Sequence, residues 1–151
     1  MELHRDYVKA GANILTTNSW GANRLKLKEH NLDDKLKLIN MKAVELAQKA
    51  GQGQVFIAGS VGPLGVRIEP FGPTAFHEAQ DIFAEQIAAL VEAKVDVISL
   101  ETFSDISEIH QAILAAKRVA PHIPVIAHVT VTMEGFSPLG TPVLWMMRKI
   151  E

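Results

Sequence analysis

A repeating unit constrains the fold of this chain more than any other feature. A short apolar run ends in a polar residue, and a loop and an amphipathic helix follow. Residues 11–18 (GANILTTN) and 94–101 (KVDVISLE) align without a gap, and further apolar runs occupy residues 55–60 and 125–129. Apolar runs that alternate with helices are typical of parallel strands joined by helical crossovers. In barrels of this kind, the functional residues lie at the carboxyl ends of the strands.

Hydrophobic periodicity and turn residues give the expected elements. Residues 2–10 have the pattern of the end of a helix, and Gly11 suits the position just after it. We expect a helix at about 33–50 that Gly51 terminates, a helix capped by Thr74, and a helix for which Asp105 and Glu108 form a capping box. The expected strands lie at about residues 13–17, 54–58, 95–100 and 125–130.

The number of strands separates two parallel architectures. The 151 residues hold four strands and three complete crossover helices, whereas a (β/α)8 barrel needs about 250 residues. An open doubly wound sheet would carry a G-x-G-x-x-G turn after its first strand, and residues 18–23 (NSWGAN) do not match it. We therefore predict an α/β chain that forms about half of a (β/α)8 TIM barrel.

Composition excludes several classes of function. A net charge of −2 and the absence of a Lys/Arg cluster argue against a nucleic-acid partner. No apolar stretch approaches the ~18 residues of a membrane span, and the N-terminus does not resemble a signal peptide, so we expect a cytoplasmic protein. Cysteine is absent, which excludes disulfides, thiolate catalysis and cysteine-ligated metal.

Polar residues at the strand ends are the candidates for ligand binding. Glu101 could pair with a cationic group such as a substrate ammonium, or could serve the following helix as a cap. Asn18 could bind a polar ligand or close its own loop. Trp20 and Gly21 offer an aromatic wall and an unhindered N–H that could bind a carboxylate, although Trp20 could equally be packed in the interior.

The segment 59–63, which contains Ser60, Val61 and Gly62, has the composition of a loop that shapes a binding site. Glycine there permits positive φ and close approach of a ligand, but no Gly-Lys-Ser/Thr follows to make a phosphate loop. The six histidines show no metal-binding spacing. His128 alone lies on an expected strand, where it is either a hydrogen-bonded core residue or a catalytic group.

Four segments in this order resemble the homocysteine S-methyltransferase family. These segments are residues 11–24, 58–63, 100–105 and 140–142. The family includes the homocysteine-binding module of methionine synthase and betaine–homocysteine methyltransferase. The residues in these segments are closer to those of the bacterial methionine-synthase type. The resemblance covers residues 3 to about 142, whereas residues 143–151 form a divergent tail.

The resemblance implies a (β/α)8 barrel with a catalytic zinc that binds homocysteine as a thiolate. The thiolate attacks a methyl donor and methionine is formed. By position, Glu101 would hold the homocysteine ammonium, and the backbone amides of Trp20 and Gly21 would receive its carboxylate. Asn18 and the segment Ser60–Gly62 would line the pocket.

The departures from the family are as informative as the matches. The family's acidic, Gly-rich first strand has no counterpart here, and its zinc ligands are cysteines on later strands. We therefore expect a single partial domain over residues 1–151, roughly strands 2 to 5, with neither catalytic residues nor metal ligands and without activity alone. The methyl donor, of the methyl-cobalamin, methyl-folate or betaine type, stays open.

Two alternatives remain at this point. The chain could be a non-catalytic half-barrel that dimerises or pairs with a complementary chain, because an open parallel sheet leaves two edges to be covered. It could also be an independent small-molecule enzyme in which Glu101 and His128 act as acid and base.

Overall fold

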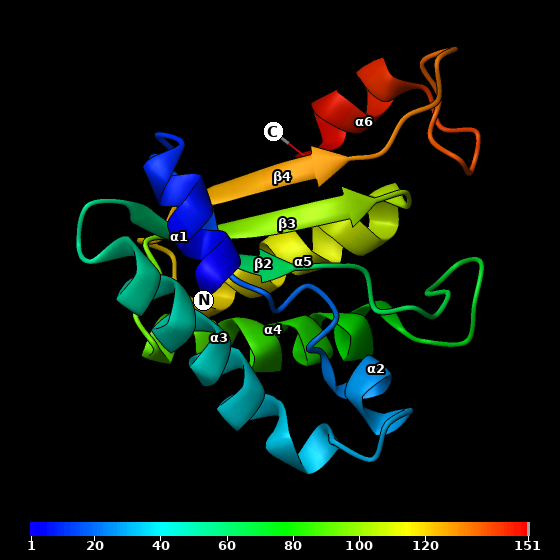
Figure 1. The fold of residues 1–151 in the computed structure, drawn as a ribbon. Coiled ribbons are helices and arrows are strands. Elements are labelled where there is room, and N and C mark those ends of the chain that lie inside the picture. Colours follow the sequence, from blue (N-terminus) through cyan, green and yellow to red (C-terminus); the bar gives the residue numbers. More distant parts are fainter. Residues whose placement is uncertain (151) are drawn as a thin grey trace.

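A computed structural model describes residues 1–150 and contains one four-stranded parallel sheet (Figure 1). The strands are β1 (Ile14–Thr16), β2 (Phe56–Val61), β3 (Val97–Phe103) and β4 (Val125–Val129). Their order in the sheet is their order in the chain, and every neighbouring pair is parallel. A doubly wound sheet would reverse its strand order at a switch point. The structure therefore confirms an α/β chain built as part of a barrel.

Helices connect successive strands. The three crossover helices α3 (Leu36–Gly51), α4 (Phe76–Glu92) and α5 (Ile106–Val119) lie along one face of the sheet, with α4 packed between the other two (Figure 1). The remaining helices are α1 (Glu2–Lys9), α2 (Arg24–Lys28), the 3-10 turn η1 (Asp33–Lys35) and α6 (Val143–Ile150). None of the helices within residues 1–150 combines the length and the apolar character needed to cross a membrane.

The core lies between the sheet and the crossover helices. Alternate strand residues such as Ile57, Val61 and Ile98 are buried in one apolar cluster with residues of the crossover helices. The ring centroids of Phe83 and Phe103 lie 5.9 Å apart, which joins α4 to the end of β3. The other sheet face is mixed: it carries Phe56, which is 62% exposed, together with polar residues such as Ser60 and Ser99. The core therefore lies on the helix-covered face.

Two strands begin or end later than predicted. β2 occupies residues 56–61, and β3 continues to Phe103. Gly59, Ser60 and Val61 therefore belong to a strand, and the prediction that they form a loop is wrong. Gly59 does not have positive φ; a Cβ there would lie 3.2 Å from Leu90 Cδ1. Close packing, and not backbone conformation, accounts for this glycine.

The ends of α3 and α4 also differ from prediction. Thr74 does not cap α4, because Ala75 is the N-cap residue and has no side-chain cap bond. Instead, Glu69 Oε2 accepts a hydrogen bond from Phe76 N, at 3.1 Å. Gly51 is the last residue of α3, and the left-handed residue that ends this helix is Gln52, with φ 50°.

The start of α5 is predicted in part. Asp105 caps this helix and accepts a hydrogen bond from Ser107 N at 2.8 Å, as expected. Glu108 was expected to complete a capping box, but its carboxylate accepts a hydrogen bond from Leu64 N at 2.8 Å. The capping-box prediction is therefore wrong, because the Glu108 side chain serves the loop after β2.

Candidate functional site

Three of the candidate residues meet at the carboxyl ends of β2 and β3. Ser60 Oγ donates a hydrogen bond to Glu101 Oε2 at 3.0 Å, and Trp20 Nε1 donates to the Glu101 carbonyl oxygen at 3.2 Å. The parallel register brings the ends of β2 and β3 together, because Ser60 pairs with Ser99. Within residues 1–150, Glu101 Oε1 has no hydrogen-bond partner. One carboxylate oxygen is thus fixed, and the other is available to a ligand.

The backbone beside Glu101 is irregular. The register between β3 and β4 shifts between Leu100 and Phe103, which marks a bulge in β3. Within the bulge, Thr102 has φ 67°, in the left-handed region that a β-branched residue rarely adopts. Such a conformation costs about 1–3 kcal/mol and is concentrated at functional sites. The bulge re-aims the side chain that precedes it, here Glu101.

Buried hydroxyl groups join the loop after β1 to the end of β2. Thr17 Oγ1 lies 2.7 Å from Ser19 Oγ and accepts a hydrogen bond from Ser60 N at 3.0 Å. Ser19 Oγ donates to the Ser60 carbonyl oxygen at 2.8 Å. From α4, Gln86 Nε2 donates to the Ser19 carbonyl oxygen at 2.7 Å. These bonds fix the loop that carries Trp20.

Trp20 packs directly against Gly62. Gly62 N donates to the Trp20 carbonyl oxygen at 2.9 Å. A Cβ at Gly62 would lie 2.7 Å from Trp20 Cδ2, so only glycine fits beneath the indole ring. Lys26 Nζ lies 3.8 Å from the centroid of this ring, which is a cation–π contact. Burial is the main cause that lowers the pKa of Lys26.

Two adjacent backbone amides remain free beside this cluster. In the described part of the chain, neither Trp20 N nor Gly21 N donates a hydrogen bond. Trp20 is 40% exposed and Gly21 is partly exposed, so a ligand can reach both residues. Consecutive free N–H groups bind anions such as carboxylates. The site thus offers an acidic acceptor and two amide donors.

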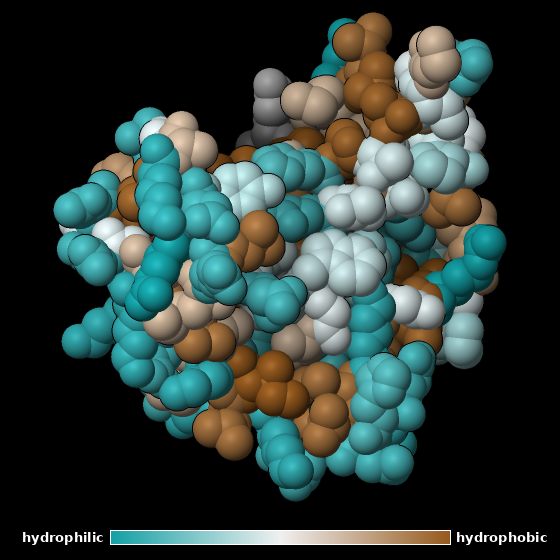
Figure 2. Space-filling model, in the orientation of Figure 1, coloured by the Kyte–Doolittle hydropathy of each residue, from teal (hydrophilic) through white to brown (hydrophobic). Residues whose placement is uncertain are grey.

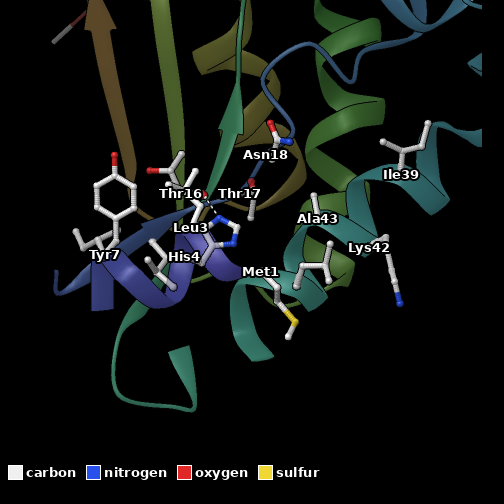
Figure 3. Close-up of a pocket in the computed structure, with 13 residues that line it drawn as sticks. Met1, Leu3, His4, Tyr7, Thr16, Thr17, Asn18, Ile39, Lys42 and Ala43 are labelled. Carbon is white, nitrogen blue, oxygen red and sulfur yellow. Dashed lines mark hydrogen bonds between the residues drawn. The ribbon is translucent and has the colours of Figure 1, made fainter. Parts of the chain in front are cut away.

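Asn18 lies elsewhere, in a groove of about 800 Å3 between α1, β1 and α3 (Figure 3). Its neighbours along the groove include His4, Thr16 and Lys42. His4 Nε2 lies 3.1 Å from the Thr16 carbonyl oxygen. No hydrogen bond within residues 1–150 joins Asn18 to the cluster around Glu101.

Glu108 supports the site through Leu64, although its spacing in the sequence predicted only a helix cap. This side chain is only 7% exposed, and burial raises the pKa of its carboxyl to about 7. The hydrogen bond from Leu64 N and the charge of Lys26 oppose this rise. The sequence could have indicated this burial, because the spacing puts Glu108 on the same helical face as Ala112 and Ala115. Both alanines are fully buried in the structure.

The residues of this chain do not fit the zinc that the resemblance implies. Within residues 1–150, no three His, Cys, Asp or Glu side chains are grouped to hold a metal ion, and the sequence contains no cysteine. His128 is exposed on β4, and no hydrogen bond in the described chain joins it to Glu101.

Comparison with known proteins identifies a family for this chain. A sequence model described as homocysteine S-methyltransferase matches residues 1–151. The chain is 28% identical to methionine synthase of Mycobacterium tuberculosis and 27% identical to that of Mycobacterium leprae, over 99% of this chain and 13% of each relative.

Solved structures extend the likeness to the fold. The metallated form of the homocysteine methyltransferase MmuM from Escherichia coli superposes with a TM-score of 0.87 at 26% identity, over 99% of this chain and 57% of that one. The apo form gives a TM-score of 0.78. The chain thus spans little more than half of MmuM and a small part of the methionine synthases. Because the family model matches it from residue 1 to residue 151 and its parallel sheet superposes on part of MmuM, the chain belongs to the homocysteine S-methyltransferase family.

Proposed function

We propose that this chain forms the part of a methyltransferase barrel that holds the amino-acid end of homocysteine. The observation that carries the proposal is Glu101, whose carboxylate is fixed by Ser60 with one oxygen left free beside the amides of Trp20 and Gly21. The ammonium group of an amino acid suits the carboxylate, and its carboxylate suits the free amides. The backbone of Val61 and Gly62 completes this wall, since the Val61 side chain is buried in the core. Asn18 lines the neighbouring groove, and its contact with the ligand stays a prediction from the sequence.

The chemical step needs groups that this chain does not contain. In the family, zinc activates the homocysteine thiol, and the cysteine ligands have no counterpart here. We therefore propose that residues 1–151 form a single partial domain, that they bind homocysteine, and that they do not transfer a methyl group alone. The methyl donor stays unassigned, and a cytoplasmic location stays a prediction from the sequence.

Titration of the chain with L-homocysteine tests the proposal. Binding is followed by amide NMR, with 4-mercaptobutanoate (no ammonium) and 3-aminopropanethiol (no carboxylate) as probes. We expect both analogues to bind at least tenfold more weakly than homocysteine, because each leaves a polar partner unpaired.

Variants locate the site. Glu101→Gln should weaken the binding of homocysteine and leave the binding of 4-mercaptobutanoate unaffected, because only the ammonium contact is lost. The exposed Glu78→Gln on α4 is the matched control. Equal binding of all three ligands, or equal effects of the two variants, would contradict the proposal. Methyl transfer by the isolated chain with added zinc would contradict the predicted inactivity.

A second candidate function, pairing with another chain, is favoured by the open edge of β1. Phe56 N donates to the Asn13 carbonyl oxygen and Thr17 N to the Ala58 carbonyl oxygen, so the peptide groups of Ile14 and Thr16 point away from β2. His4 Nε2 of α1 reaches the Thr16 carbonyl oxygen, whereas no hydrogen bond in the described chain covers the peptide groups of Ile14 on this edge. Apolar side chains also gather over α6 (Figure 2), where Leu144 is 75% exposed. A second copy or a complementary half-barrel could cover these surfaces. Sedimentation showing a monomer at all concentrations would contradict self-association.

A further inference from the structure

Two carboxylates from one stretch of chain hold the segment Ser60–Leu64 at both ends. Glu101, within β3, accepts the hydrogen bond of Ser60 Oγ at 3.0 Å. Glu108, in the first turn of α5, accepts that of Leu64 N at 2.8 Å. Between these two points, Gly62 N donates to the Trp20 carbonyl oxygen. Hydrogen bonds to β3 at one end and to α5 at the other therefore hold the segment that forms the wall of the candidate site.

In the described chain, Glu108 makes its hydrogen bond to Leu64 N and none to Glu101, Trp20 or Gly21. It is 7% exposed, and its bonding partner Leu64 is fully buried. The charged groups that act on it are Lys26 from α2, which attracts its carboxylate, and Asp105 on its own helix, which repels it. Lys26 also covers the Trp20 ring. Glu108 is thus connected to Trp20 both through the segment 62–64 and through Lys26.

Neither helix capping nor packing accounts for this carboxylate. Asp105 already caps α5. An apolar side chain would fill the same space without the cost of removing a carboxylate from water. An apolar side chain would, however, leave the buried N–H of Leu64 without an acceptor, which is costly. Only Glu or Gln has a side chain long enough to place a hydrogen-bond acceptor beside Leu64 N from this position.

We propose that Glu108 is a positioning residue of the candidate site, which holds the segment Ser60–Leu64 against Trp20 so that the ligand-binding wall keeps its shape. This inference rests on the proposed function for its effect on homocysteine, but its effect on the segment can be measured without any ligand.

The test compares Glu108→Ala with Glu108→Gln in the full chain. Glutamine keeps the acceptor oxygen, so it should restore what alanine removes. Gln111→Ala is the matched control, because Gln111 is 9% exposed on the same helix and makes no hydrogen bond to the segment. Glu108→Asp, which keeps the charge but shortens the reach, replaces the alanine variant if that variant does not fold.

The readouts are hydrogen exchange at the Gly62 and Leu64 amides, the Trp20 indole N–H resonance, and homocysteine affinity. For Glu108→Ala we expect roughly tenfold faster exchange at both amides, a shifted indole resonance and roughly tenfold weaker binding. Glu108→Gln should stay within about twofold of the original chain on each measure.

Unchanged exchange at Gly62 and Leu64 in Glu108→Ala, or an equal change in Gln111→Ala, overturns the positioning role. Failure of the unaltered chain to bind homocysteine overturns the proposed function instead, and the exchange rates still decide whether Glu108 holds the segment.

Discussion

Replacement of Glu108 by glutamine should remove a pH-dependent loss of stability. Burial raises the pKa of this carboxyl from 4.5 to about 7 in the folded chain. A difference of about 2.5 between the pKa values of the folded and unfolded chains corresponds to about 3 kcal/mol of unfolding free energy. Because Glu108 is only 7% exposed, solvent screening reduces this figure little.

The direction in which the unfolding free energy changes with pH follows from proton binding. Between pH 4.5 and 7 the folded chain holds the Glu108 proton and the unfolded chain has released it, so unfolding becomes easier as the pH rises. The stabilising contribution is complete below pH 4.5 and is lost as the pH passes 7. Glutamine has no proton to lose and keeps an oxygen for Leu64 N. We therefore expect Glu108→Gln to match the original chain near pH 4 and to exceed it by up to about 3 kcal/mol at pH 8.

Urea unfolding followed by circular dichroism, at pH values from 4 to 8, measures this difference directly. Subtraction of the two curves cancels the titration of all groups that both chains share. The exposed Glu78→Gln serves as the control and should leave the pH dependence in place. A constant difference between Glu108→Gln and the original chain across this range would refute the electrostatic reasoning.

Three further substitutions test the packing around the site. Gly62→Ala should destabilise the fold by about 1–3 kcal/mol and shift Trp20 fluorescence, since the added Cβ meets the indole ring; unchanged fluorescence would contradict the close contact. Thr102→Gly should raise the unfolding free energy by about 1 kcal/mol in chemical denaturation, because glycine tolerates φ 67°, and a loss of stability would show that the bulge is unstrained. Phe83→Ala should cost about 3–5 kcal/mol and lower the melting temperature, since its buried ring packs against Phe103, and a change near zero would place this ring outside the core.

The sequence predicted the fold well because the signals for it are local. Alternation of apolar runs and amphipathic helices requires only neighbouring residues, and all four strands lie where these runs occur. The end of β2 was predicted too early because glycine is typical of turns. Gly59 is instead required by close packing of the strand against Leu90 of α4, which lies far away in the sequence. Helix α2 went unpredicted because five residues capped by Asn23 leave too short a pattern.

The candidate site was predictable only in part for the same reason. Glu101 and Ser60 follow from their places at strand ends, and the structure joins them by a hydrogen bond. The bond from Leu64 N to Glu108 spans two different crossover units, and a capping-box spacing gave Glu108 a plausible local partner instead. Long-range partners of buried charges are therefore the part of this site that a single sequence does not reveal.

The agreement between sheet order and chain order has a consequence for synthesis on the ribosome. Each strand pairs with the next one to emerge, from Ile14 with Phe56 to Ile98 with Val125. No strand has to wait for a distant segment, and each new crossover helix packs on one already made, as α4 does on α3. The nascent chain can therefore assemble in the direction of translation, with the most recently made strand always at the growing edge.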